Sequence, residues 1–562
     1  MQKDCSTCGQ SFKISPEELA YIGEMTFAFG EKAFHPIEPT KCPTCRLRLR
    51  VAHRNEKNLY ANVSAKSGKP IISIYAPGAL WGEPYKIYSQ EEWNHEGFDT
   101  MAYGREIDWS RSFFEQFSAL SKDVPRMAVV THSNENSEYT TGTAYSKNCY
   151  LINSSEYCED CYYGKLYQTC SDVIDSAYMY DSELCYGCFS LHQCTRCIYV
   201  SFSKNSHDCA FSSGLQGCNN CFLCTNLTQK KYHFRNEPLE PEEYKKRVQE
   251  YMGSYAKYEE ARTEMAERMR GKVWKYANIV DSSNCTGDYI ELSNNCFECF
   301  DMDGCEDCRY VQVAGEGSDC MHSSNLYLKP ELVYETLGTL EGHTIAYCLY
   351  VFHCHNVLYS EQCYHCRDCI GCSGLKRKQY CIFNKQYSKE EYETLAARLI
   401  EQMQRDGEWG HFFPANRSAF GYDESVAQEY LPLTKDEAIR QGFLWREHVD
   451  APPNVTKIVP ADRLPDRIEE IPDDVTDWAV SCAQTGKPFR IVKQELAFYR
   501  THGIPLPRLH PDVRYRKRME MRNPRTLYDR TCTECSLPVR STFAPDRPET
   551  VVCEACYRKA IQ

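Results

Sequence analysis

The sequence lacks the features that would place it in a membrane or in an oxidising compartment. No apolar run approaches the ~20 residues that a membrane-spanning helix needs. The start, Met1–Cys5, shows no basic segment followed by an apolar one. The 34 cysteines, without an export signal, favour a reducing compartment in which thiols bind metal or pack as small apolar groups. We therefore expect a cytoplasmic protein with no membrane partner.

Catalytic motifs and an excess of positive charge are also missing. The chain has no HExxH pair, no phosphate-binding glycine loop and no Ser-His-Asp nucleophile elbow. No small-molecule substrate is evident from the sequence, and we expect a protein that is not an enzyme. The net charge of −13 argues against indiscriminate nucleic-acid binding, although local basic patches occur. A chain of 562 residues is too long for one core, so several domains are expected.

Cysteine is abundant instead, and from residue 146 to residue 224 it recurs with a period of twelve. One column comprises Cys149, Cys161, Cys185, Cys197, Cys209 and Cys221, with Val173 in the remaining place. A second column, three residues upstream, comprises Ser146, Cys158, Cys170, Ser182, Cys194, Ser206 and Cys218. A fixed short period is typical of repeat proteins. Twelve residues suit one coil of a narrow β-solenoid, or half of a 24-residue coil, with equivalent residues about 4.8 Å apart.

The array is present twice. Cys185, Cys188, Cys194, Cys197 and Cys209 reappear 111 residues later as Cys296, Cys299, Cys305, Cys308 and Cys320. The close of the first block, Cys218, Cys221 and Cys224, reappears 148 residues later as Cys366, Cys369 and Cys372. The two offsets differ because the second copy carries an insertion, which we place around residues 329–342. The middle of the chain is therefore predicted to be a duplicated repeat array.

Two interpretations of the array cysteines stay open. The first is a ladder of reduced thiols that fills a thin core, because cysteine is a compact buried residue. The second is metal binding by Cys185, Cys188, Cys194 and Cys197, and by Cys296, Cys299, Cys305 and Cys308. The run Cys363–Cys372 has a superficial likeness to a ferredoxin motif but lacks its last spacing and its proline. A metal, iron–sulfur or redox carrier is accordingly one alternative function.

Both ends of the chain carry a predicted zinc site. Near the start, two CxxC pairs supply Cys5, Cys8, Cys42 and Cys45. Near the end, two further pairs supply Cys532, Cys535, Cys553 and Cys556. Two CxxC pairs can close a tetrahedral zinc shell, and four protein ligands leave no position for a catalytic water. We expect about two structural zinc ions per chain.

The two ends are diverged copies of one module, with an offset of 468 over much of their length. Cys42-Pro-Thr-Cys45-Arg46 aligns with His510-Pro-Asp-Val513-Arg514, for example. The C-terminal counterpart of the first site is Cys482, Thr485, His510 and Val513, which is too poor in ligands for tight zinc binding. The N-terminal counterpart of the second site is Ser64, Ser67, Ser89 and Glu92, which has no thiolate. Each module thus keeps one four-cysteine site.

A basic segment accompanies each module. The residues are Arg46, Arg48, Arg50 and Arg54 at one end, and Arg514, Arg516, Lys517, Arg518 and Arg522 at the other. The functional interpretation is a surface that contacts phosphates of RNA or of a ribonucleoprotein. The structural interpretation is a solvated face of an amphipathic element. A further hypothesis is a protein–protein scaffold that uses the solenoid surface.

The predicted fold class is α+β and multidomain, with a duplicated 12-residue-repeat β-solenoid between two related zinc-ribbon or treble-clef-like modules. The expected parts are 1–60 (zinc module with basic segment), 61–145 (small α+β cap), 146–236 (first solenoid block), 237–273 (helical segment), 274–387 (second block), 388–430 (helical cap), 431–475 (Pro/Asp-rich tether) and 476–562 (zinc module).

Several motifs together resemble a family of uncharacterised bacterial cysteine-rich proteins with zinc-ribbon-like domains at both termini. They include Cys42-Pro-Thr-Cys45-Arg46, Asn148–Ile152, Lys378–Asn384, Gly421–Tyr430, Gly486–Ile491 and Cys553–Tyr557. The resemblance spans the chain and implies zinc binding, without implying an activity. The chain departs from the family pattern at His510 and Val513, where CPxCR would be expected, and this puts zinc binding at that position in doubt.

Overall fold

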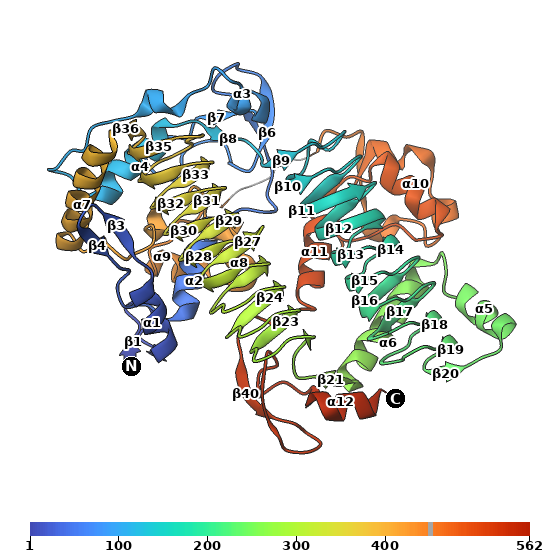
Figure 1. Ribbon diagram of the computed structural model, residues 1–562. Coiled ribbons are helices and arrows are strands. Elements are labelled where there is room, and N and C mark those ends of the chain that lie inside the picture. Colours follow the sequence, from blue (N-terminus) through green and yellow to red (C-terminus); the bar gives the residue numbers. More distant parts are fainter. Residues whose placement is uncertain (448–452, 562) are drawn as a thin grey trace.

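The computed structural model describes residues 1–447 and 453–561 and shows a mixed α+β protein of several parts (Figure 1). Two stacks of short parallel strands form the middle, and modules with a group of four cysteines stand near both ends of the chain. Among the described residues, no helix combines the length and the apolar character needed to cross a bilayer. At this level the predicted α+β architecture with two terminal cysteine clusters is confirmed.

The first stack, residues 131–238, is a 12-stranded sheet whose neighbouring strands are parallel except for the last pair. Its strands are β9 (Thr131–His132), β10 (Thr141–Ala144), β11 (Tyr150–Glu159), β12 (Tyr162–Ile174), β13 (Ala177–Tyr180), β14 (Glu183–Tyr186), β15 (Phe189–His192), β16 (Ile198–Lys204), β17 (Ala210–Ser213), β18 (Asn219–Phe222), β19 (Lys231–Phe234) and β20 (Glu237–Pro238). Each residue pairs with the one twelve positions further on, as Tyr150 does with Tyr162. The sheet already includes residues 131–144, which were expected to belong to the preceding cap.

The chain turns a corner at every third residue of a coil, where the backbone is left-handed. In one coil the corners are Leu151, Ser154, Tyr157 and Asp160, with φ of 51°, 51°, 53° and 53°. Such a conformation costs a residue other than glycine on the order of 1 kcal/mol. The parallel hydrogen-bond ladder and the buried interior must therefore offset a strain that recurs around every coil.

The residue that follows each corner points into the coil, and these inward side chains are mostly small or aliphatic. In the same coil these residues are Ile152, Ser155, Cys158 and Cys161, all of them buried. The Cys158 thiol lies 3.3 Å and 3.4 Å from two backbone carbonyl oxygens, one in its own coil and one in the next. A small side chain with a polar atom can thus fill the narrow core and also hydrogen-bond to buried peptide groups.

Serine makes equivalent hydrogen bonds to the backbone at other inward positions. The Ser176 hydroxyl donates to the carbonyl of Ile174 at 3.0 Å and accepts from the backbone N–H of Cys188, one coil further on, at 3.0 Å. This pattern explains why cysteine and serine alternate in the sequence columns: both are small, and both can bond the backbone of the next coil.

An aromatic ring also lies inside the first stack. Tyr167 lies inside its coil, where its hydroxyl donates to the carbonyl of Ser176 and accepts from the N–H of the same residue, both at 2.9 Å. The inward position before it is Gly164, where an added Cβ would come within 2.0 Å of the tyrosine ring. The glycine therefore makes the room that the ring occupies.

The second stack, residues 279–386, is built in the same way from an 8-stranded and a 7-stranded sheet. The first sheet contains β22 (Ile279–Val280), β23 (Gly287–Glu291), β24 (Cys299–Asp303), β25 (Gln312–Gly315), β27 (Ser324–Tyr327), β29 (Leu337–Leu340), β31 (Leu349–Phe352) and β33 (Glu361–Tyr364). The second contains β26 (Ser318–Met321), β28 (Glu331–Tyr334), β30 (His343–Ala346), β32 (His355–Leu358), β34 (Arg367–Ile370), β35 (Gln379–Ile382) and β36 (Lys385–Gln386). The register of twelve shortens to eleven at Ile279–Ile290 and lengthens to thirteen at Ser318–Glu331.

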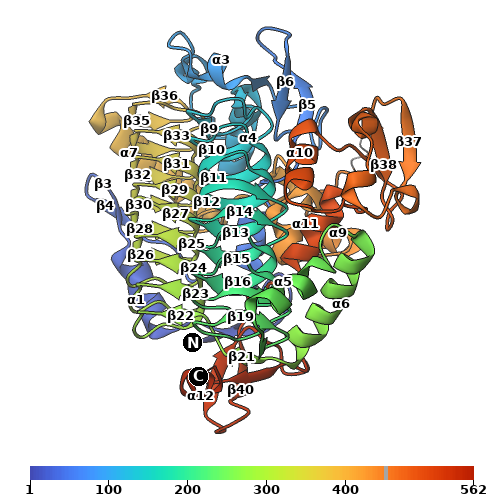
Figure 2. The same cartoon turned by 90° about the vertical axis from the view of Figure 1, so that its right-hand side faces the viewer.

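The two stacks lie side by side and run in opposite directions, so that β9 and β36 lie at one end of the molecule and β19 and β22 at the other (Figure 2). Helices α5 (Pro241–Gln249) and α6 (Tyr255–Gly271) and strand β21 (Val273–Lys275) connect them, and α7 (Lys389–Arg405) follows the second stack. Helix α8 (Val426–Tyr430) lies at the end of the predicted helical cap, α9 (Lys435–Arg440) lies in the predicted tether, and residues 448–452 of the tether lie outside the described residues.

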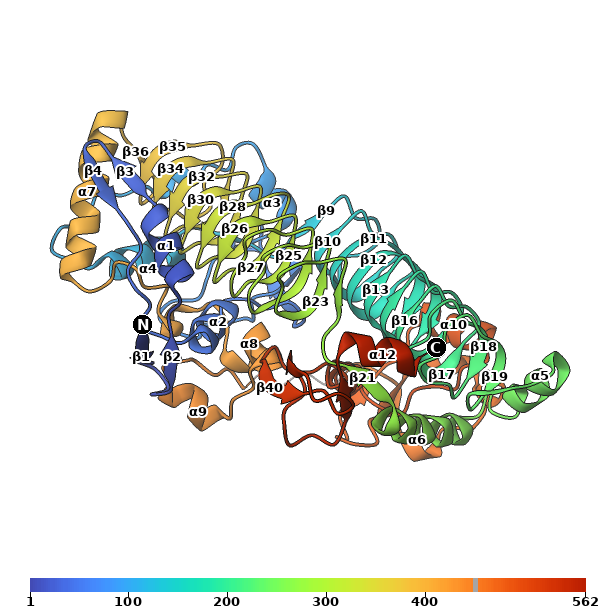
Figure 3. The same ribbon diagram turned by 60° about the horizontal axis from the view of Figure 1, so that its bottom comes forward.

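Each terminal module packs against the stack that is remote from it in sequence (Figure 3). The N-terminal module packs on the second stack and contains β1 (Gln2–Asp4), β2 (Ser11–Lys13), α1 (Pro16–Glu24), β3 (Phe27–Phe29), β4 (Lys32–Phe34), α2 (Pro43–Val51), β5 (Tyr60–Val63), β6 (Pro70–Ser73), β7 (Ile87–Tyr88) and α3 (Gln90–Asn94). The C-terminal module packs on the first stack through α10 and α11 and on the second through β41, and contains β38 (Trp478–Ser481), β39 (Pro488–Phe489), α10 (Lys493–Thr501), α11 (Pro511–Met519), β40 (Tyr528–Thr531), β41 (Pro538–Ser541), β42 (Thr550–Val552) and α12 (Glu554–Ala560).

Candidate metal centres

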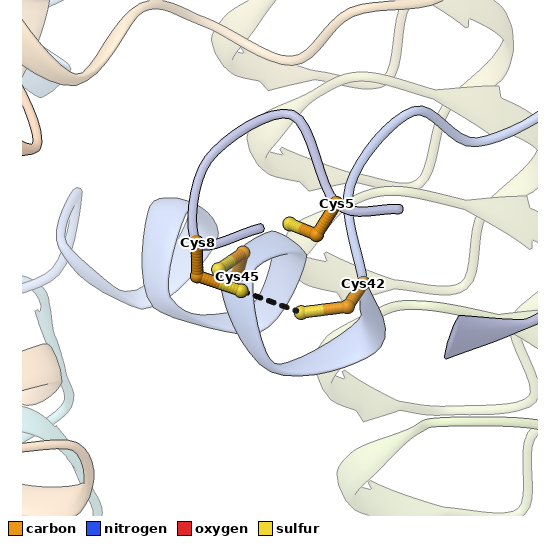
Figure 4. A group of neighbouring side chains, drawn as sticks. All are labelled: Cys5, Cys8, Cys42 and Cys45. Atoms are coloured by element: carbon orange, nitrogen blue, oxygen red, sulfur yellow. Dashed lines mark hydrogen bonds between the residues drawn. The ribbon is translucent and has the colours of Figure 1, made fainter. Parts of the chain in front are cut away.

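The N-terminal cysteines converge on one point from a turn and a helix end (Figure 4). Cys5 and Cys8 lie in the turn between β1 and β2, while Cys42 is the N-cap residue of α2 and Cys45 lies in its first turn. The four sulfur atoms lie within 4.8 Å of one another, and Cys8 Sγ is 3.8 Å from Cys42 Sγ. A hydrogen bond with the Cys45 thiol lowers the pKa of Cys42 to about 5.

The C-terminal cysteines repeat this arrangement. Cys532 and Cys535 lie in the turn between β40 and β41, while Cys553 is the N-cap residue of α12 and Cys556 follows in its first turn. The four sulfur atoms again lie within 4.8 Å of one another, with Cys535 Sγ 3.7 Å from Cys553 Sγ. The N–H of Cys553 donates to the Cys532 sulfur at 3.3 Å, so the helix start is tied to the turn.

Both groups fit a tetrahedral zinc ion. Zinc–thiolate bonds of about 2.3 Å place the sulfur atoms of a tetrahedral site about 3.8 Å apart, which is the separation measured across each group. Four cysteines complete the shell, so the bound ion would serve as a structural link between turn and helix rather than activate water. The predicted zinc-binding capacity of the two terminal modules is supported in this form.

The two counterpart positions hold hydrogen bonds in place of thiolates. In the N-terminal module, Glu92 occupies the centre and accepts from the Ser64 hydroxyl at 2.5 Å and from the Ser89 N–H at 2.9 Å. Although burial acts in the opposite direction, hydrogen bonds from Ser64, Ser67 and Ser89 lower the pKa of Glu92 to about 2. A carboxylate held by three serines therefore replaces four thiolates in the same local fold.

The other counterpart position keeps one thiol. Hydrogen bonding by Thr485 and by the backbone of His510 lowers the pKa of Cys482, although partial burial acts to raise it. His510 Nδ1 accepts from the N–H of Asp512 at 3.1 Å, so this imidazole caps α11. Among the described residues, the two four-cysteine groups are the clusters whose ligand atoms lie within 4.8 Å of one another.

The array cysteines lie inside the coils. The two tetrads predicted as additional metal sites are Cys185, Cys188, Cys194 and Cys197, and Cys296, Cys299, Cys305 and Cys308. All eight are buried, each sulfur lies within 3.8 Å of backbone carbonyl oxygens, and within the described part of the chain neither tetrad forms a four-ligand group. These contacts favour the interpretation as a packed ladder of reduced thiols.

The N-terminal basic segment faces the protein interior, which corrects the expectation of a phosphate-binding surface. Arg46 and Arg50 on α2 both bond the buried carboxylate of Glu335, which is a corner residue of the second stack. Arg54 bonds Glu56 at 2.5 Å, and Arg48 lies near the Cys45 sulfur and Gln441.

The C-terminal basic segment does the same on the first stack. Arg514 and Arg518 on α11 both bond Asp175, a buried corner residue of that stack. Arg522 bonds Asp301 of the second stack. Arg516 and Lys517 remain exposed. Most of these cations therefore hold the modules on the stacks and do not form an exposed surface for a nucleic acid.

The carboxylates Glu335 and Asp175 are the functional residues that the sequence did not reveal. The signal that could have pointed to them is the duplicated pair of arginines four residues apart, Arg46 with Arg50 and Arg514 with Arg518. Two arginines four residues apart lie on one helix face and can share an anion, but the pair does not identify which acid of the array supplies it.

Comparisons with known proteins give no further assignment. No protein-family profile matches the chain, and no curated protein matches it. Among solved structures, a protein described as an acetyltransferase from Desulfovibrio desulfuricans G20 matches with 11% identity, over 50% of this chain and 71% of that chain. Its TM-score is 0.12, and the likeness carries no argument about this protein.

Proposed function

We propose that the chain is a zinc-binding, non-enzymatic binding protein in which two structural zinc ions hold the terminal modules on a rigid pair of β-solenoids. The observation that carries this proposal is the pair of four-cysteine groups with tetrahedral spacing. A solenoid with 12-residue coils is supported by the pairing of each residue with the one twelve positions on. Its outer walls are the surface offered to partner proteins.

Each zinc site lies at a joint of the molecule. The first fixes the start of α2, and four residues after Cys42 the same helix presents Arg46 to Glu335 of the second stack. The second fixes the start of α12, directly after β42, which pairs in parallel with β21 in the connection between the stacks. Loss of the first ion would therefore weaken the contact of α2 with the second stack, and loss of the second would weaken the pairing of β42 with β21, in addition to disordering the local turn.

Metal content tests the proposal. We expect about two zinc ions per chain and no visible absorption for protein purified anaerobically without added metal, measured by elemental analysis. Cys535→Ser should remove one zinc ion. Cys482→Ser is the matched control, because it alters the metal-free counterpart of the first site, and it should leave the zinc content unchanged. More than two zinc ions, or an iron–sulfur spectrum, would show that the array thiols bind metal and would favour a carrier function.

RNA is a partner class that the buried arginines do not support. The basic residues left for it are Arg516 and Lys517, which are exposed on α11. An RNA affinity that falls steeply with salt and is lost in the double variant Arg516→Gln, Lys517→Gln would establish an RNA partner. If no such RNA binding is found, we favour a function in which the solenoid surface binds a protein partner.

A further inference from the structure

A cavity of about 270 Å³ lies between the first stack, α6 and the C-terminal module. One wall is aromatic and includes Tyr186, Tyr199 and Phe211 from the stack and Tyr258 from α6. Ligand sites in proteins are commonly apolar or aromatic cavities with a few convergent polar groups, and this volume lies near their lower limit of about 300 Å³. The cavity suits a small ligand with a flat apolar part.

The lining carries more cations than anions, although the whole chain is acidic. The cations are Arg262, Arg508, Arg514, Lys517 and Arg518, and the acids are Asp175 and Glu259. Glu259 bonds Arg262 at 2.6 Å, which leaves Asp175 for the remaining cations. The lining of this cavity therefore carries an excess of positive charge.

Two of these cations have no carboxylate partner among the described residues. The Arg508 guanidinium lies 4.0 Å from the centre of the Tyr255 ring and donates from Nη2 to the carbonyl of Leu464. Asp466, whose field also reaches Arg508, is bonded to Ser254. Lys517 is exposed and forms no ion pair within the part of the chain that the structure describes.

The N-terminal module provides an internal comparison. There Arg46 bonds two carboxylates, Glu335 and Glu18, while Arg50 bonds Glu335, so two acids serve two arginines. On the C-terminal helix α11, Asp175 bonds both arginines, as Glu335 does at the N-terminal site, and Arg514 has a second acid, Glu495, nearby.

The counterpart of Glu18 is Glu495, which is committed elsewhere. Its carboxyl accepts from the hydroxyls of Tyr499 and Tyr163 and lies 3.7 Å from Arg514. Burial raises the pKa of Glu495 to about 7. Nε and Nη2 of Arg514 and Nε of Arg518 are buried without a hydrogen-bond partner. The second acid of the C-terminal site thus lies beyond hydrogen-bonding distance of its arginine, whereas Glu18 bonds Arg46 at 3.3 Å.

We propose that this cavity binds a small aromatic phosphate, the class to which mononucleotides belong. The planar guanidinium groups of Arg514 and Arg518 would bond phosphate oxygens, since arginine is suited to this geometry. The rings of Tyr199 and Phe211 would stack against the aromatic part of the ligand. Lys517 at the exposed side would add a further cation, and the bound anion would complete the charge balance of the α11 contact.

The test is calorimetric titration of AMP and of inorganic phosphate into the full zinc-loaded chain. We expect AMP to bind once per chain, and phosphate to bind at least tenfold more weakly because it lacks the ring. Arg508→Gln and Lys517→Gln should each weaken AMP binding at least tenfold. Lys517 is exposed, so that variant should fold normally. The matched control is Arg247→Gln on α5, outside the cavity, which should bind AMP as the unaltered chain does.

Three results would overturn the proposal. The first is an absence of binding by both probes at millimolar concentration. The second is equal weakening by Arg247→Gln, which would indicate a diffuse charge effect. The third is phosphate binding as tight as that of AMP, which would exclude an aromatic ligand. None of these results depends on the number of zinc ions bound, so failure here is distinguishable from failure of the metal assignment.

Discussion

Replacing Glu335 by glutamine removes the anion that holds the N-terminal module on the second stack. The side chain is buried and bonds Arg46 and Arg50 together. Although burial opposes ionisation, these two cations lower the pKa of Glu335 from 4.5 to about 2. A lowered carboxyl pKa stabilises the folded state above the unfolded value of about 4.5, and this contribution is lost as the pH falls toward 2. The shift corresponds to about 3 kcal/mol at pH 7.

A second line of reasoning gives a similar magnitude. Removing one partner of a buried ion pair costs about 3–5 kcal/mol, because the other partner stays buried without compensation. We therefore expect Glu335→Gln to lower the free energy of unfolding at pH 7 by about 3–5 kcal/mol. Urea unfolding of the zinc-loaded chain, followed by circular dichroism and by tryptophan fluorescence, measures this change.

The matched control is Glu341→Gln. Glu341 is also a corner residue of the second stack, but it is exposed and pairs with the partly exposed His353. Exposed ion pairs contribute about 0–1 kcal/mol, so the control should change stability by no more than that. If Glu335→Gln costs as little as the control, the module is not held by this carboxylate and the reasoning is refuted.

Three further predictions concern the coils and the C-terminal module. Gly164→Ala should lower the free energy of unfolding by about 1–3 kcal/mol because its Cβ would meet the Tyr167 ring. In a double-mutant cycle measured by thermal unfolding, Tyr167→Ser should reduce that loss. If the effects of the two substitutions on the free energy of unfolding are additive, the clash is contradicted. Cys197→Ser should leave the zinc content unchanged and reduce stability by less than about 2 kcal/mol, since serine can make the same backbone hydrogen bonds; a lost metal ion would show that Cys197 is a ligand. Burial raises the pKa of Glu495 to about 7, so this carboxyl stabilises the fold most below pH ~4.5 and less as the pH rises toward 7. Glu495→Gln should accordingly raise the urea midpoint of unfolding at pH 8, and raise it much less at pH 5. An equal shift of the midpoint at both pH values would exclude titration of Glu495 as the cause.

The coil length was predictable from the sequence because inward positions recur at fixed spacing. The offset between the two copies grows from 111 to 148 residues, a difference of three coils plus one residue. The structure accommodates the odd residue where the register becomes thirteen, at Ser318–Glu331. The cysteine and serine columns of the sequence did not reveal that an inward-facing position recurs at every third residue within each coil. Positions such as Ile152, Gly164 and Val200 share one inward column, but they share no chemistry that a cysteine count would detect.

The metal centres were predictable for a different reason: a CxxC pair is local, and its geometry follows from one turn. The role of the arginines could not be predicted, because their carboxylate partners lie far away in the sequence. Arg46 and Glu335 are 289 residues apart, and Arg514 and Asp175 are 339 apart. Acidic residues are frequent at coil corners, for example Asp160 and Asp172. Only the folded arrangement identifies the acid that meets the arginine pair.

The crossed packing of modules on stacks has a consequence for synthesis on the ribosome. The N-terminal module emerges first, but Glu335 follows Arg46 by 289 residues, which takes about 15–60 s at 5–20 residues per second. During that interval the two arginines of α2 lack the Glu335 carboxylate, although Arg46 already has Glu18, and the nearby cysteines can already bind zinc. The first stack likewise waits for α11, because Arg514 follows Asp175 by 339 residues. The nascent protein therefore exposes docking faces during both intervals, and a chaperone or an early metal supply would act in that period.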